Sequence, residues 1–157
     1  MYNKIFTSED LLKRVEFWRM LGDKIVFTNG CFDILHEGHI RVLSSALSFG
    51  DRLIVGLNAD ESVKRLKGPH RPVNSEQSRA VLLAALLYTD AVIIFTEDTP
   101  ENLIHLIRPD VLVKGGDWNK DAIVGSDFVE SYGGEVKTVP YLDGFSTTAI
   151  IERSKRP

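Results

Sequence analysis

The chain has 157 residues, of which 43% are hydrophobic and 26% are charged, and this composition suits a soluble globular domain with a sizeable core. A formal net charge of −3 argues against non-specific binding to nucleic acid or to an anionic membrane surface. The single cysteine, Cys31, excludes an internal disulfide framework and any metal site built from several thiolates, and we expect a reducing, cytoplasmic setting.

The domain organisation follows from what the chain lacks. The first residues carry acids and bases at short intervals and no long apolar run, so we expect neither a signal peptide nor a membrane span. There is no internal repeat, low-complexity tract or linker of domain-separating composition. We therefore predict one domain over residues 1–157, with an N-terminal helical extension over 1–22 and a main core over 24–151.

Segments typical of helices and of buried strands alternate along the chain. Ser8 or Thr7 can cap a helix that has apolar residues on one face. The run "KIVFTNG" after it is a short apolar stretch closed by Asn-Gly, as in a buried strand. The predicted strands cover residues 24–30, 51–60, 91–95, 110–116 and 135–140. The predicted helices cover residues 8–20, 38–50, 59–66, 75–89, 99–107, 126–133 and 146–154.

This alternation predicts a doubly wound, Rossmann-like α/β domain with a five-stranded parallel sheet. In such sheets ligands bind beyond the carboxyl ends of the strands, near the point where the strand order reverses. Polar stretches stand at four of these ends: "TNG", "LNAD", "VKGGDW" and "DGFSTT". We expect them to converge in one cleft.

The first of these stretches continues as "TNGCFDILHEGH" and indicates anion binding. Residues 28–30 turn sharply out of a strand, and Gly30 lets a phosphate approach the backbone closely. The next helix begins near Gly38, where free amides and the helix dipole favour an anion. His36 and His39 flank this helix start, and imidazoles there can donate hydrogen bonds to phosphate oxygens.

Two other interpretations of the histidine pair stay open at this stage. A zinc site requires three or four protein ligands, and helical pairs usually stand at i and i+4, whereas His36 and His39 stand at i and i+3. Cys31 is typical of a packed small residue, so we predict no metal site built from these side chains. A turn without any chemistry would also fit the pattern. Neither a P-loop, nor a G-x-G-x-x-G, nor a G-x-S-x-G sequence occurs.

The stretch "NGCFDILHEGH" resembles the GxFDxxHxGH signature of the nucleotidylyltransferase superfamily, and "GFSTT" resembles its second motif. The resemblance runs from about Ile25 to Ile151, which implies that residues 24–151 form a catalytic core. Through "RLKG", "RPVN" and "VKGGD" the chain is similar to the D-glycero-β-D-manno-heptose 1-phosphate adenylyltransferase (ADP-heptose synthase) domain.

The resemblance implies transfer of AMP from ATP to the heptose 1-phosphate, giving ADP-heptose and pyrophosphate for lipopolysaccharide core synthesis. Mg²⁺ would accompany ATP, with ligands drawn largely from water and phosphate. A separate sugar kinase would supply the sugar 1-phosphate, because heptose enzymes are often fused to a kinase domain that these 157 residues lack.

The resemblance also implies a set of side chains that hold the triphosphate and the charge developing during transfer: His36, His39, Lys67 and Arg79. Without the resemblance, two of these side chains could have roles that involve no ligand. Lys67 stands in the loop "RLKGPHRP" and would otherwise be an exposed lysine. Arg79 would otherwise lie on a solvated helix face or cap Glu76, whereas the resemblance favours donation to phosphate oxygens.

A further set would surround the nucleotide: Thr28, Asn29, Gly30, Phe32, Asp33, Gly38, Lys114, Gly116, Asp117, Ser146, Thr147 and Thr148. Asp33 either orients the turn through hydrogen bonds to amides, which we favour, or touches the nucleotide. Asp117 could bond a ribose or base edge, and Trp118 either stacks on the ligand or packs. The hydroxyls of residues 146–148 either cap the last helix or help its terminus to hold a phosphate.

The base, the acceptor and the assembly are less defined. In "YLDGFSTT", Tyr141 and Leu142 replace the Arg-Thr that cytidylyltransferases of the superfamily commonly show, which favours adenine. Glycerol 3-phosphate or FMN as acceptor, or an inactive nucleotide-binding sensor, are the alternatives. The segment Val81–Leu87 fits a core or an interface between copies, so a homo-oligomer stays open, and the helix ending near Met20 serves either the core or a partner.

Overall fold

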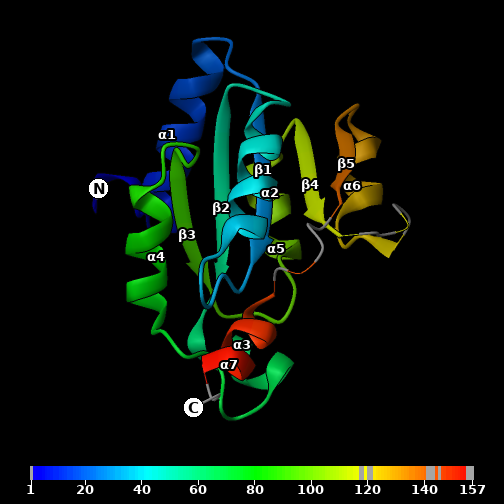
Figure 1. Ribbon diagram of the computed structural model, residues 1–157. Coiled ribbons are helices and arrows are strands. Elements are labelled where there is room, and N and C mark those ends of the chain that lie inside the picture. Colours follow the sequence, from blue (N-terminus) through cyan, green and yellow to red (C-terminus); the bar gives the residue numbers. More distant parts are fainter. Residues whose placement is uncertain (1, 117–118, 120–121, 141–143, 145, 155–157) are drawn as a thin grey trace.

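The computed structural model describes residues 2–116, 119, 122–140, 144 and 146–154. A single five-stranded sheet has the order β3-β2-β1-β4-β5, and all neighbouring strands run parallel. Its strands are β1 (Ile25–Gly30), β2 (Arg52–Asn58), β3 (Ala91–Phe95), β4 (Val111–Gly115) and β5 (Glu135–Val139). The order reverses between β1 and β4, so the predicted doubly wound α/β fold is confirmed (Figure 1).

Helices cover both faces of the sheet (Figure 1). α2 and α4 pack on one face, whereas α1, α5 and α6 pack on the other. α3 and α7 lie beyond the carboxyl ends of the strands. The helices are η1 (Tyr2–Lys4), α1 (Ser8–Met20), α2 (Glu37–Leu47), α3 (Asp60–Lys67), α4 (Glu76–Ala85), α5 (Glu101–Ile107), α6 (Ser126–Ser131) and α7 (Thr147–Ser154). Within the described residues, no helix has the length and apolar character needed to cross a bilayer.

Burial on both faces explains the continuous apolar runs of the strands. In β1, Ile25 and Phe27 belong to the core beneath α1 and α5, whereas Val26 belongs to the core beneath α2 and α4. Successive strand side chains point to opposite faces, so an apolar residue is required at every position. Each fully buried side chain of this kind contributes about 1.5–3 kcal/mol to stability. The last two residues of β1 are only half-buried, because they reach the edge where the cleft opens.

The N-terminal helix α1 packs on this core. Its cap is Thr7, whose side chain accepts a hydrogen bond from the amide of Asp10. Leu11, Val15 and Trp18 recur at helical spacing and are all buried against the sheet. Of the two roles considered for this helix, packing on the core is therefore the one observed.

The predicted helix over 75–89 is shorter than expected. α4 ends at Ala85, and Leu86 is extended, with φ −73° and ψ 142°. The Nζ of Lys4 donates to the carbonyl oxygens of Leu86 (3.3 Å) and Thr89 (2.7 Å). These acceptors are therefore bonded by a side chain from near the N-terminus, which the local helical pattern could not reveal.

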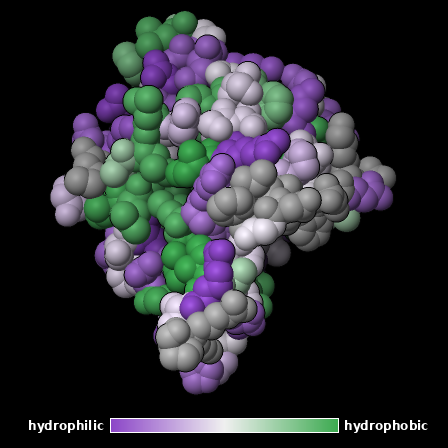
Figure 2. Space-filling model, viewed as in Figure 1, coloured by the Kyte–Doolittle hydropathy of each residue, from purple (hydrophilic) through white to green (hydrophobic). Residues whose placement is uncertain are grey.

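The segment Val81–Leu87, considered as a core or an interface element, is partly buried and partly exposed. Leu83 and Ala84 are buried, whereas Leu82 is 42% and Leu87 89% exposed. Figure 2 shows hydrophobic residues gathered over this side of the molecule, around α4. A homo-oligomer stays a prediction.

Candidate active site

A cleft with a volume of about 380 Å³ opens at the carboxyl edge of the sheet. All four polar stretches that follow strands contribute to its wall, as expected from the position of the strand ends. The predicted site residues that line it are Thr28, Asn29, Gly30, Phe32, Asp33, His39, Lys67, Lys114 and Thr147.

The turn after β1 depends on the packing of Phe32. This residue has φ +45°, which is uncommon for a side chain other than glycine and marks local backbone strain. A Cβ added at Gly30 would lie 3.0 Å from Cε2 of the Phe32 ring, so the missing side chain makes room for the ring. The ring of Phe32 also lies against His39, with 5.2 Å between the ring centroids. Gly30 and Phe32 thus shape the turn and support one of the histidines.

The two histidines are brought together by the start of α2. His36 is the residue before the helix, with extended backbone, and His39 lies in the first turn. Their rings are stacked, with 3.8 Å between centroids and 24° between planes. Among the described residues no group of three or more histidine, cysteine, aspartate or glutamate side chains could hold a metal ion. Each imidazole of this stacked pair has an N–H that can donate to an anion.

Burial favours the neutral form of both imidazoles. The pKa of His39 is lowered from 6.5 to about 4, first by burial and then by the nearby charges of His36 and Lys67. Burial also lowers the pKa of His36. The Nδ1 of His39 has no hydrogen-bond partner among the described residues, so none of them fixes which ring nitrogen carries the proton. Each neutral ring can still donate one N–H to a phosphate oxygen.

Two lysines approach the cleft from different elements. Lys67 is the last residue of α3, is exposed, and forms no ion pair with any residue that the structure describes. Lys114 stands near the end of β4, where burial lowers the pKa of its ammonium and the nearby Cys31 acts in the opposite direction. The Nζ of Lys114 lies 3.4 Å from Oδ1 of Asn29, which links the ends of β1 and β4. The cleft therefore carries positive charge on both sides of the β1 turn.

Asp33 bonds backbone amides, but these amides belong to the distant loop before α4 and not, as expected, to the turn around Asp33. Its side chain is 1% exposed and accepts hydrogen bonds from Arg71 Nε (2.6 Å) and from the amides of Val73 (2.7 Å) and Asn74 (3.0 Å). Burial alone would raise the pKa of this carboxyl, but the bonds from Asn74, Arg71 and Val73 outweigh it and lower the pKa below its usual value. Asp33 also lines the cleft, but its carboxylate is engaged by the loop that precedes α4.

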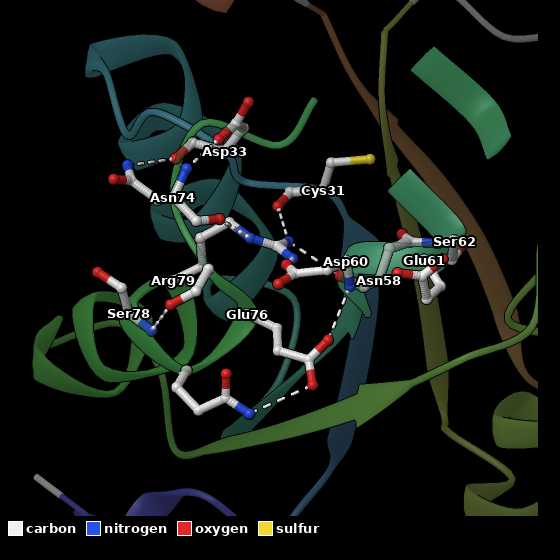
Figure 3. A network of polar contacts seen from close by, with 12 residues as sticks. Cys31, Asp33, Asn58, Asp60, Glu61, Ser62, Asn74, Glu76, Ser78 and Arg79 are labelled. Atoms are coloured by element: carbon white, nitrogen blue, oxygen red, sulfur yellow. Dashed lines mark hydrogen bonds and ion pairs between the residues drawn. The ribbon is translucent and has the colours of Figure 1, made fainter. Parts of the chain in front are cut away.

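Arg79 differs from the expected phosphate-binding arginine. Its side chain is completely buried, and it is not among the residues that line the cleft. Nε donates to the carbonyl oxygen of Asn74 (3.0 Å), and Nη1 donates to those of Cys31 (2.6 Å) and Asn58 (2.9 Å). Nη2 donates to Oδ1 of Asp60 at 2.7 Å (Figure 3). We call Arg79 and these four acceptor residues the Arg79 clasp.

The remaining predicted residues fall into two groups. Those near the cleft but outside its wall are His36, Gly38, Gly116, Ser146 and Thr148. In the last helix, Oγ of Ser146 accepts a hydrogen bond from the amide of Ala149 (3.1 Å), so this hydroxyl caps α7 while Thr147 reaches the cleft. Asp117 and Trp118 lie outside the described residues, as do Tyr141 and Leu142.

The cleft also contains residues that the sequence analysis did not name individually. Asn58 is 3% exposed, and its Nδ2 donates to Oγ of Ser62 (3.0 Å), which fixes the amide at the end of β2. Asp98 and Thr99 follow β3 and line the same wall. Asn58 belongs to the stretch "LNAD", which was expected at the cleft, and the same strand-end rule could have found Asp98 and Thr99. The segment 122–124 also lines the cleft but carries no recognisable signal.

Sequence comparison identifies the family of this chain. Residues 27–153 match the cytidylyltransferase-like family, which is most of the chain. The chain belongs to the cytidylyltransferase-like family. The resemblance to nucleotidylyltransferases is thereby confirmed.

Curated members of the family are similar over nearly the whole chain. The bifunctional protein HldE of Hyphomonas neptunium is 60% identical over 151 residues, and that of Koribacter versatilis is 54% identical over 150 residues. Each alignment covers 96% of this chain and 31% of the relative, so the chain spans about a third of the length of these relatives.

Solved structures agree with the family match. The lipopolysaccharide core biosynthesis protein of Thermoplasma volcanium GSS1 has a TM-score of 0.67 and 28% identity, and the match covers 78% of this chain and all of that one. The pantoate-beta-alanine ligase of Francisella tularensis has a TM-score of 0.56 and 16% identity, covering 92% and 75% of the two chains. The second likeness supports the fold alone.

Proposed function

We propose that the chain transfers the adenylyl group of ATP to D-glycero-β-D-manno-heptose 1-phosphate, forming ADP-heptose and pyrophosphate for lipopolysaccharide core synthesis. The observation that carries the proposal is that three features meet at one cleft at the carboxyl edge of the sheet. They are Lys67, Lys114 and the turn over residues 28–39, which we call the histidine turn. Membership of the cytidylyltransferase-like family supports the reaction type. The similarity to the T. volcanium lipopolysaccharide core biosynthesis protein supports a role in lipopolysaccharide core synthesis.

The reaction is a displacement at the α-phosphorus of ATP. An oxygen of the sugar phosphate forms a bond to that phosphorus, and the bond to the oxygen bridging the α- and β-phosphates breaks, so that its electron pair leaves with pyrophosphate. The nucleophile is already an anion, and no strong general base is required. Holding the two anions in line can contribute roughly 7–11 kcal/mol to lowering the barrier.

The chain's own residues supply hydrogen-bond donors and positive charge. In the proposal, His36 and His39 donate to the phosphate oxygens whose charge grows during transfer, and Lys67 approaches the same oxygens from α3. The residues assigned to nucleotide contacts are Thr28, Asn29, Gly30, Phe32, Gly38, Lys114, Gly116, Asp117, Thr147 and Thr148. Asp33, Ser146 and Arg79 act on the protein framework, because their side chains bond protein groups.

The proposal includes Mg²⁺ bound with ATP. Bound Mg²⁺ would neutralise phosphate charge, and it takes mainly oxygen ligands from water and phosphate. Asp33 does not fit as its ligand, because three protein donors occupy this carboxylate. The described residues thus agree with an ion held largely by the nucleotide and water. A cytoplasmic setting and supply of the sugar 1-phosphate by a separate kinase belong to the same proposal.

The test is pyrophosphate release with Mg²⁺, ATP and D-glycero-β-D-manno-heptose 1-phosphate, run beside CTP and beside glycerol 3-phosphate and FMN. We expect rapid release only with ATP and the heptose phosphate. Release with another acceptor would retain the reaction type and reject the pathway. Binding of ATP without release from any pair would instead identify a nucleotide-binding sensor.

A further inference from the structure

We infer that Arg79 is a positioning residue, which holds the histidine turn and the segment carrying Lys67 in register without touching substrate. The inference rests on the proposed function, because this register matters for turnover only if the two segments bind one triphosphate. It assigns to this buried side chain a role other than the donation to phosphate oxygens that the resemblance implied.

The hydrogen bonds of the guanidinium leave Arg79 little capacity for a ligand. A guanidinium has five N–H donors, and here it bonds three carbonyl oxygens and one carboxylate. The side chain is 0% exposed. Turning toward the cleft would leave three carbonyl oxygens and the half-buried Asp60 carboxylate without their donor, and it would leave the buried guanidinium without its partners, which is costly. The observed arrangement is therefore a framework contact.

The four acceptors of the Arg79 clasp belong to segments that build the cleft. Cys31 lies between Gly30 and Phe32 in the histidine turn, and Asn58 ends β2. Asp60 begins α3, the helix that ends at Lys67. One guanidinium thus connects the turn on one side of the cleft to the helix that carries the lysine on the other.

A second charged group extends the clasp to the loop over 68–75. The carbonyl oxygen of Asn74 accepts from Arg79, while its Nδ2 donates to the carbonyl oxygen of Asp33 at 2.8 Å. The Asp33 carboxylate holds the loop amides of Val73 and Asn74 (Figure 3 shows Asp33 beside Asn74). At the start of α3, the amide of Asp60 donates to Oε2 of Glu76 at 2.7 Å. Asn74 therefore bonds both Arg79 and Asp33, and through it the loop is connected to the clasp.

The clasp requires arginine because its four acceptors surround the planar guanidinium group. Lysine would retain the charge on a single nitrogen, and that nitrogen cannot reach all four acceptors in the geometry of a guanidinium. Arg79→Lys should therefore loosen the clasp while keeping a positive charge. Asp60→Asn removes the ionic partner of Arg79 and leaves the arginine in place, and Asp60 does not line the cleft.

The experiment compares Arg79→Lys and Asp60→Asn with Arg14→Lys, a control on the exposed face of α1. Hydrogen exchange of the Val73 and Asn74 amides is measured in the free protein by NMR. We expect both clasp variants to exchange faster by on the order of tenfold or more. Turnover with ATP and the heptose phosphate should fall by about a hundredfold in Arg79→Lys, since small misplacements have effects of this size. The KM for ATP should change much less than kcat.

Two outcomes would overturn the inference. The first is unchanged amide exchange in both clasp variants. The second is a large rise in the KM for ATP in Arg79→Lys with none in Asp60→Asn, which would indicate direct contact between Arg79 and phosphate. If Arg79→Lys does not fold, the amide exchange and the kcat of Asp60→Asn test the inference, and no change in either would overturn it. Absence of turnover in the unmodified protein would instead reject the proposed function, since the exchange measurement needs no substrate.

Discussion

The open face of the cleft and the Arg79 clasp behind it use positive charge in different ways. Lys67 is exposed and forms no ion pair with the described residues, whereas Arg79 is completely buried and bonds four protein oxygens. A solvated charge contributes little to folding, whereas a buried one is stable only with its partners. The difference teaches that an arginine expected to bind phosphate can instead bond the protein framework.

The largest expected effect is on the free energy of unfolding, which should change much more when Arg79 is replaced than when Lys67 is. Arg79→Gln should lower the free energy of unfolding by about 3–5 kcal/mol, because it leaves Asp60 and buried carbonyl oxygens without their donor. Lys67→Gln should change it by less than about 0.5 kcal/mol. Urea denaturation followed by circular dichroism measures both. Equal losses in the two variants would remove the distinction between the clasp and the open face.

On the open face, the largest effect should belong to the histidines. His39→Ala should lower kcat by about 10²–10³-fold, the usual effect of removing one donor that stabilises developing charge. ATP affinity should change little, and His36→Ala should act in the same direction. The control is His105→Ala, which alters an exposed histidine of α5 outside the cleft wall. Similar losses in kcat and affinity would point to ordinary ground-state binding, and no change in either would reject the assignment.

A smaller effect should distinguish Lys67 from its neighbours on α3. Lys67→Ala should lower kcat/KM about tenfold, and the loss should diminish at high ionic strength, because the lost interaction is electrostatic and solvated. Lys64 is the matched control, since it is exposed on the same helix and pairs with Glu61 at 2.6 Å. Steady-state kinetics of Lys64→Ala at the same salt concentrations should resemble those of the unmodified chain. A loss of equal size in both variants would show that only the general charge of α3 matters.

The smallest effect concerns pH and the neutral state of His39. Its pKa is about 4 in the folded chain and 6.5 in its ordinary state, so between these values the unfolded chain binds more protons than the folded one. Stability should therefore fall as pH decreases from about 6.5 to 4. In His39→Gln this decrease should be smaller, by about 1 kcal/mol since solvent reaches part of the ring. Urea denaturation across this pH range measures the difference, and parallel curves for the two proteins would contradict it.

Much of the framework was predictable because its causes are local. Strands covered on both faces need apolar residues at every position, as in "IVF" of β1, and the alternation with helical segments then predicts a parallel sheet. Helix ends were less predictable where a distant group intervened. The end of α4 at Ala85 is accompanied by hydrogen bonds from Lys4, which lies in η1.

By itself, the sequence determined the doubly wound sheet and the meeting of the two histidines, since His36 and His39 stand within one helical turn of each other. Only the tertiary structure decided what surrounds each charged side chain. The acceptors of Arg79 include Cys31 and Asn58, and those two residues become its neighbours only when β1, β2 and α4 pack together. Charge and spacing along the chain cannot separate a buried arginine from an exposed lysine, because burial is a property of the packed segments around them.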